Sequence, residues 1–407
     1  GGGTVSKDAI NIDFEGKKID MGRLLINTDY KVDGLLAGRG TITGSMDNPQ
    51  FNGYILSDAL SINGQLLTDL HGHVYADKSV VNVQDFSFAE SNGGRYVAKG
   101  GMKLDDSKQL FGVLDVTNGS VKNLLALLDR KNEHLDGKLN GSVEIGGTKD
   151  NPSVTVDGKI NEVSIDDKVV GDATIDASLA NRKFKITTLK LPVDEGLIAM
   201  GGTLDLDGEA DLQVALKDVD IVPFLPLVGK DIQATGWVTG VVNVTGKTKN
   251  PKVELSGAVE SGSFNGIGID EGFVLATMQD HVIQIQRIQG AKGGYKLSIY
   301  GKIPLAALYT SGYIEASNAK SMDVTIDFNE ADMAVIPLVT TSVKDATGPL
   351  KGVIRLTGTI DQPEAYGTVS VRNGTMKLAN VDNEITGIDG DLIFSGQQGD
   401  FQSRINM

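Results

Sequence analysis

The sequence contains no cysteine and a single tryptophan, and aromatic residues make up only 5% of its 407 positions. Without cysteine there is no disulfide framework, no thiolate metal ligand and no thiol nucleophile. No apolar run approaches the roughly 20 residues that a membrane-spanning helix requires, and no signal peptide is visible. The net charge of −15 argues against nucleic acid as a partner, because phosphates attract clusters of lysine and arginine.

The chain also lacks a recognisable catalytic constellation. His71 and His73 share one strand face, but no third ligand is close in sequence, so a surface pair is favoured over a metal site. Asp205, Asp207 and Asp211 resemble a calcium loop only in composition, and a turn is the better interpretation. We therefore expect no enzyme activity, no cofactor and no metal. Carbohydrate binding is not expected either, because a single tryptophan provides few aromatic platforms.

A motif of Gly, five residues, Gly, four residues and Pro recurs about every 100 residues along the chain, which indicates a repeat array. Its copies are Gly38–Gly44–Pro49, Gly141–Gly147–Pro152, Gly240–Gly246–Pro251 and Gly352–Gly358–Pro363. Alternating, β-branched segments flank a polar turn in each copy, so each motif predicts a β-hairpin. The approximate repeats are 20–118, 119–218, 219–328 and 329–407, with the last one truncated. We expect one continuous elongated body, cut at both ends from a longer protein.

The alternation gives each predicted strand one dry and one wet face. The residues assigned to the dry face are Ile42, Ile55, Val143, Ile145, Val154, Val156, Ile160, Val242, Val244, Val253, Leu255, Val259, Ile354, Leu356 and Val369. A β-bulge at any glycine corner would move the residues after it to the other face. Short apolar stretches before the motifs, at 21–25, 121–128, 222–227 and 334–338, predict short helices or turns between repeats.

The repeats resemble the TamB and AsmA-like family of bridge-type lipid-transfer proteins of diderm bacteria. The similarity lies in a Leu-x-Gly start, as in Leu36-Ala-Gly38, Leu139-Asn-Gly141 and Leu350-Lys-Gly352, followed by an alternating strand and Gly-x4-Pro. The stretch 348–396 is the most similar, whereas Val238-Thr-Gly240 departs from the pattern. The resemblance runs through all the repeats, and it rests on their shared register rather than on any single motif.

This resemblance implies an all-β fold called a β-taco: an elongated, U-shaped curved sheet with an apolar groove, and a few short helices between repeats. It implies a periplasmic, envelope-spanning conduit for phospholipid acyl chains between inner and outer membrane, anchored to the inner membrane outside this sequence. The dry-face residues would then line the groove. A scaffold for outer-membrane β-barrel assembly with a BamA-family partner is the alternative, and a stalk with a self-filled core is a third hypothesis.

Overall fold

The structure is a computed structural model that describes residues 1–6, 9–24, 31–127, 134–228, 233–264, 267–292, 295–308, 321–338, 342–359, 362–380 and 383–405. The chain divides into two compact units. Unit 1 comprises Gly1–Asp194 and Ala199–Leu206, and unit 2 comprises Glu195–Ile198 and Asp207–Met407. Strand β13 (Gly196–Asp205) contains the boundary between them.

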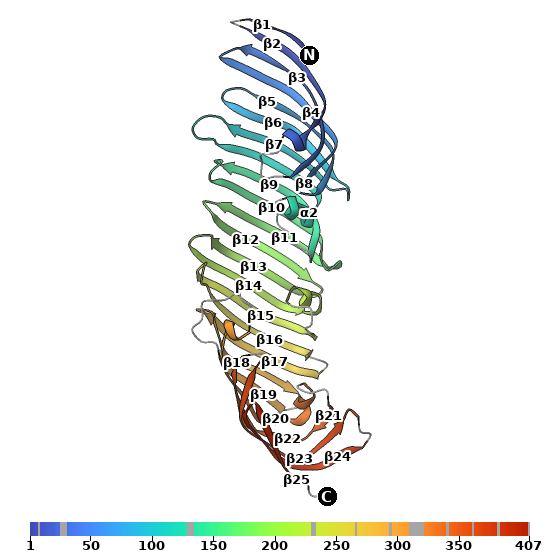
Figure 1. Ribbon diagram of the computed structural model, residues 1–407, viewed down its shortest axis with the longest axis vertical. Coiled ribbons are helices and arrows are strands. Elements are labelled where there is room, and N and C mark those ends of the chain that lie inside the picture. The colour runs from blue at the N-terminus through green and yellow to red at the C-terminus, as the bar shows by residue number, and fades with distance from the viewer. Residues whose placement is uncertain are drawn as a thin grey trace. The chain divides into compact units, whose positions relative to one another are not determined.

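Unit 1 is an antiparallel sheet in which each strand from β1 to β12 pairs with the next one along the chain (Figure 1). Within the described residues no pairing joins β1 to β12, so this sheet is open. Its strands are β1 (Gly2–Val5), β2 (Ile10–Asp20), β3 (Val32–Ser45), β4 (Asn48–Ile62), β5 (Gln65–Ala76), β6 (Val80–Glu90), β7 (Arg95–Lys103), β8 (Leu110–Ser120), β9 (Leu135–Gly147), β10 (Pro152–Ile165), β11 (Lys168–Ala180) and β12 (Lys183–Val193).

Unit 2 follows the same sequential antiparallel pairing from β14 to β20, and then β20 pairs with β22 instead of β21. The displaced strand β21 pairs with the far half of β23. The strands of unit 2 are β14 (Glu209–Asp220), β15 (Ala234–Lys247), β16 (Lys252–Phe264), β17 (Ile267–Gln279), β18 (Val282–Lys292), β19 (Tyr295–Pro304), β20 (Met322–Asp332), β21 (Val343–Thr347), β22 (Pro349–Gly358), β23 (Pro363–Leu378), β24 (Glu384–Gly396) and β25 (Gln398–Ile405).

Each Gly-x5-Gly-x4-Pro motif forms a β-hairpin, as predicted: β3–β4, β9–β10, β15–β16 and β22–β23. The second glycine is the last or second-to-last residue of the first strand, and its φ is positive in every copy: +100° at Gly44, +77° at Gly147, +84° at Gly246 and +83° at Gly358. Residues with a Cβ are disfavoured at such angles, so the turn geometry explains why glycine recurs there.

Short helices follow the strands that precede the motifs. They are α1 (Met21–Leu24), α2 (Val121–Leu127), η1 (Val222–Phe224) continuing into α3 (Leu225–Val228), α4 (Leu305–Leu308) and η2 (Met333–Leu338). The predictions of an all-β chain and of short helices between repeats are confirmed, although residues 25 and 128 lie outside the described ranges. Helix α4 was not predicted, because four residues are too few to display a helical period.

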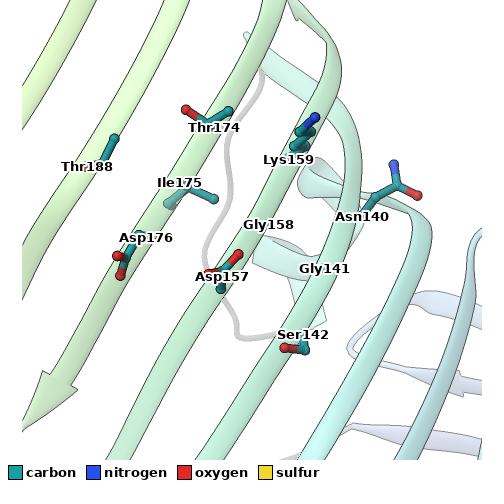
Figure 2. A pocket seen from close by; sticks show the side chains of 10 residues that line it. All are labelled: Asn140, Gly141, Ser142, Asp157, Gly158, Lys159, Thr174, Ile175, Asp176 and Thr188. Atoms are coloured by element: carbon teal, nitrogen blue, oxygen red, sulfur yellow. The ribbon is translucent and has the colours of Figure 1, made fainter.

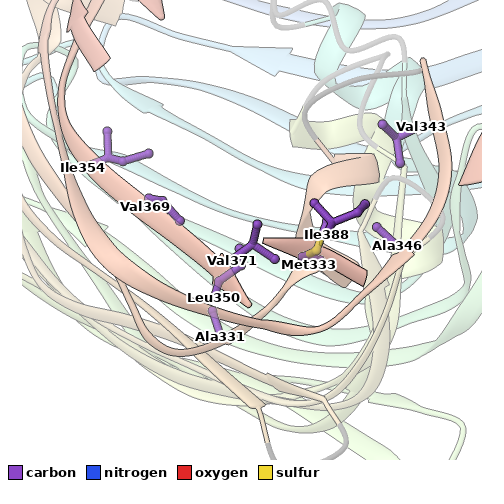
Figure 3. Packing of buried hydrophobic residues seen from close by; sticks show 9 residues of the cluster. All are labelled: Ala331, Met333, Val343, Ala346, Leu350, Ile354, Val369, Val371 and Ile388. Carbon is purple, nitrogen blue, oxygen red and sulfur yellow. The ribbon is translucent and has the colours of Figure 1, made fainter. Parts of the chain in front are cut away.

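Among the described residues a large buried cluster lies in unit 2, where β20 to β24 bend around nine apolar side chains (Figure 3). Met333 from η2 and Ala346 from β21 are each 1% exposed, and they pack with Ile354, Val369 and Ile388. Figure 3 shows Val343 and Ala346 across the cluster from Ile354 and Val369. Strand β21 therefore covers a part of the sheet face that would otherwise be open.

Candidate functional site

In unit 1 one face of the sheet carries continuous rows of apolar residues. Directly opposed residues of an antiparallel pair point to the same face, so the strand register defines these rows. One row runs through Ile12, Ile42, Phe51, Ala76, Val81, Met102 and Leu110. The adjacent row runs through Phe14, Gly40, Gly53, Val74, Val83, Gly100, Gly112, Ile145, Val154, Leu179 and Phe184. Every position that we assigned to the dry face in unit 1 lies on this face.

Unit 2 has an equivalent face, built by the same rule. One row runs through Val214, Val242, Leu255, Ala276, Ile285, Gly301, Val324, Leu356 and Ala365. Another runs through Val274, Ile288, Ile299, Ile326, Ile354, Gly367 and Phe394. The bulges in these strands lie outside the stretches that join the predicted dry-face positions. Within each hairpin, the residues assigned to the dry face therefore all point to the same side of the sheet.

The apolar faces are only partly covered by the chain itself. Most of the predicted lining residues are half-buried, including Val242 and Leu255, and Ile145 is 39% exposed. Ile354 and Val369 are the exceptions, at 9% and 8%, because the cluster of Figure 3 closes over them. A filled core would bury such positions throughout, whereas most of the predicted lining residues here are only half-buried.

Near the cluster, unit 2 also has a partly enclosed apolar pocket of about 350 Å³. It is lined by Ala334 and Val335 of η2 together with Ile269, Ala291 and Leu297. The start of η2 is held by Asp332, the last residue of β20, which is 6% exposed. Its carboxylate accepts hydrogen bonds from the backbone N–H of Ala334 at 2.9 Å and of Gly348 at 2.8 Å.

The opposite face of the sheet is polar. In unit 2 a row of opposed residues reads Gln213, Asn243, Glu254, Thr277, Gln284, Lys302, Asp323, Thr357 and Glu364. The Arg355 guanidinium donates to both carboxylate oxygens of Asp323, at 2.6 and 2.8 Å, and these hydrogen bonds hold the pKa of Asp323 below its usual value. Val242 and its neighbour Asn243 therefore belong to an apolar and a polar row, respectively.

A polar depression of about 490 Å³ lies on the same kind of face in unit 1, across β9 to β12 (Figure 2). Asp157 and Asp176 are directly opposed within it, and Ser142, Lys159 and Thr188 contribute further polar side chains. None of these side chains is fully buried. The depression offers hydrogen-bonding groups to a solvated ligand, and our sequence reasoning did not single it out, since no motif marks it.

Within the described ranges no group of three or more His, Asp or Glu side chains is arranged to hold a metal ion. His71 donates or accepts at Ser87 Oγ, 2.9 Å from Nε2, whereas His73 bonds Asn52 and stacks on Tyr54. The His71 imidazole thus has a hydroxyl partner, and the His73 imidazole has an amide and an aromatic ring as partners. Asp205 ends β13 and Asp211 lies inside β14, so these residues do not form one loop.

Comparisons with protein-family models, curated proteins and solved structures find no match for this chain. The longest helix of the described ranges, α2, has seven residues, and none of the helices there could cross a membrane.

Proposed function

We propose that the apolar face of each unit is a trough that carries lipid acyl chains, and that the protein transfers phospholipid between the inner and outer membranes of the cell envelope. Two properties of this apolar face support the proposal. Its rows are continuous from strand to strand, and most of its side chains remain half-buried. The repeat motif's resemblance to the TamB and AsmA-like family supports the same function.

The energetics of the trough suit movement of a lipid along it. Each acyl CH2 exposed to water costs about 0.8 kcal/mol, so a chain in contact with successive apolar rows avoids most of that cost. The rows contain mostly aliphatic side chains and glycines with a few phenylalanines, and contact with them is non-directional. Neighbouring sites should therefore bind an acyl chain similarly, which favours passage over retention, and headgroup selectivity should be weak along the rows.

Photo-crosslinking in cells tests the proposal at Val242 and Asn243, which are adjacent in β15 and belong to opposite faces. A photoreactive amino acid is placed at each position, and attached phospholipid is detected by mass spectrometry. We expect lipid at Val242 and none at Asn243. Absence of lipid at both positions would refute the conduit and favour the β-barrel scaffold or the self-filled stalk.

A further inference from the structure

Unit 1 has a second depression that the lipid trough does not use, on the polar face across β2 to β6. Its volume is about 690 Å³. The strand register places Glu15, Arg39, Tyr54, His73 and Gln84 in one directly opposed row. A second row beside it contains Ala37, Leu56 and His71. Side chains from five strands therefore point to the same side of the sheet.

The site presents an aromatic ring to solvent. Tyr54 is 54% exposed, and its neighbour two residues along, Leu56, is 49% exposed. The Tyr54 ring stacks on the His73 imidazole with 4.5 Å between centroids and 9° between planes, and His73 is held in turn by Asn52. One face of the tyrosine is thus covered by a fixed imidazole. In the described ranges no other ring stacks on Tyr54, so the second face is available as a platform.

Arg39 is the guanidinium of the site, and its row neighbour on the other strand is Glu15, whose pKa is lowered by the hydrogen bond from Lys17 and, more weakly, by the charge of Arg39. Arg39 opposes Tyr54 directly, and it forms no ion pair or side-chain hydrogen bond with any residue in the described part of the chain. Both carboxylates that line the depression have lysine partners: Glu15 pairs with Lys17 at 3.0 Å and Asp85 with Lys99 at 3.3 Å. Because Glu15 and Asp85 already bond lysines, the hydrogen-bonding groups of the Arg39 guanidinium are not occupied by either carboxylate of the site.

We propose that this depression binds an acidic saccharide, in which a pyranose ring packs on Tyr54 and a carboxylate accepts hydrogen bonds from Arg39. The C–H face of a pyranose is apolar and can pack on the face of an aromatic ring, while the tyrosine hydroxyl stays in contact with water. The planar guanidinium fork matches a carboxylate, which it can bind with two parallel hydrogen bonds. The depression also lies within the 300–1,000 Å³ typical of small-ligand sites. Our expectation that carbohydrate binding is absent rested on tryptophan alone and did not consider exposed tyrosine.

The test uses two disaccharides that differ in one group, cellobiouronic acid with a carboxylate and neutral cellobiose. Saturation-transfer NMR and calorimetry measure their binding to the wild-type chain. We expect Tyr54→Ala to weaken binding of both sugars about tenfold through loss of the platform, and Tyr54→Phe to preserve it. Arg39→Gln should weaken the acid about tenfold or more and leave cellobiose unchanged.

Matched control variants are available in unit 2. Tyr366→Ala removes another tyrosine that is 45% exposed, and Arg355→Gln removes an arginine that Asp323 already neutralises. Neither should alter binding of either sugar. The proposal is overturned if wild-type chain binds neither disaccharide, if Tyr54→Ala binds as wild type, or if Arg39→Gln weakens both sugars equally. Arg39-dependent binding of a polyglutamate peptide without saccharide binding would also overturn it, in favour of an acidic protein partner.

Discussion

Replacing Tyr96 by phenylalanine removes one hydroxyl from the most completely buried side chain of unit 1. Tyr96 is 0% exposed, and its ring stacks on Phe88 with 4.6 Å between centroids. The hydroxyl donates to Glu90 Oε1 at 2.5 Å, and Glu90 itself is only 4% exposed. Phenylalanine keeps the ring and its stacking, so the variant isolates the hydrogen bond.

The expected cost follows from what remains around the Glu90 carboxylate. It accepts from Asn123 Nδ2 at 3.2 Å and from the backbone N–H of Ser120 at 3.3 Å, and no ion pair in the described ranges compensates its charge. Hydrogen bonds to charged groups contribute about 1.5–3 kcal/mol each. Tyr96→Phe should therefore lower the local free energy of unfolding by that amount, which corresponds to about 10- to 100-fold faster amide exchange.

Hydrogen exchange followed by mass spectrometry is the appropriate assay, because a repeat array need not unfold in a single two-state transition. Peptides from β6 to β9 should report the change. Tyr75→Phe is the control, since that hydroxyl also donates to a carboxylate, Asp77 at 2.9 Å, but in a less buried place. Exposed interactions of this kind contribute at most about 1 kcal/mol. Equal effects of the two variants would refute the reasoning.

The same variant has a pH signature. Burial and the hydrogen bond to Glu90 raise the pKa of Tyr96 above its ordinary value of 10. The folded state therefore favours the neutral phenol, and its stability falls once pH rises above about 10, where the unfolded tyrosine ionises. Tyr96→Phe should lose this part of the alkaline dependence of exchange in β6 to β9, whereas an unchanged alkaline slope would contradict the assignment.

Three further predictions concern the trough and the turns. Val242→Asp should abolish lipid co-purification with an unchanged circular dichroism spectrum, whereas Asn243→Asp should retain lipid. Gly147→Ala should destabilise its hairpin more than Gly246→Ala in thermal unfolding. Both variants place alanine at a positive φ, which costs about 1–2 kcal/mol. A Cβ at Gly147 would in addition lie 2.5 Å from a backbone oxygen, whereas a Cβ at Gly246 meets nothing within 4 Å. Hydrogen bonds from Ser79 lower the pKa of Asp77 to about 2. The stability that the ionised Asp77 carboxylate contributes is therefore present above pH 3.8 and is lost as pH falls to about 2. In acid titrations followed by hydrogen exchange, Asp77→Ala should lack this loss of stability.

The hairpins were predictable because each one is encoded locally. A glycine such as Gly147 is required by its positive φ, and the proline five residues later faces it across the turn. Alternation also placed the assigned residues of each hairpin on one common face, since the bulges lie beyond the residues concerned. The two-unit division and the open or filled state of each face had no comparable local signal.

Long-range pairing explains most of what the sequence did not reveal. Strand β21 is five residues long, and nothing in it indicates that it skips β22 and pairs with β23. The outer-face row of Arg39, Tyr54 and His73 likewise depends on the register of three strands. Only the His71-Gly-His73 pattern pointed toward that area, and we interpreted it as a surface pair, without the stack on Tyr54 that the structure shows.

Equivalent repeat positions on the apolar face of unit 2 differ in how exposed they are. Val242 is half-buried and belongs to no buried cluster among the described residues, so in the proposed conduit an acyl chain could contact it directly. Ile354 occupies an equivalent repeat position but is 9% exposed, and it belongs to the buried cluster that also contains Met333 and two β21 residues. A ligand could reach Ile354 only by displacing that cluster, and losing several buried apolar side chains from their contacts costs about 2–5 kcal/mol for each large one. If lipid moves along unit 2, its path must therefore leave the covered face near Ile354 or wait for β21 and η2 to open. The apolar pocket beside η2, which adjoins this cluster, is where such a path would first meet the obstruction.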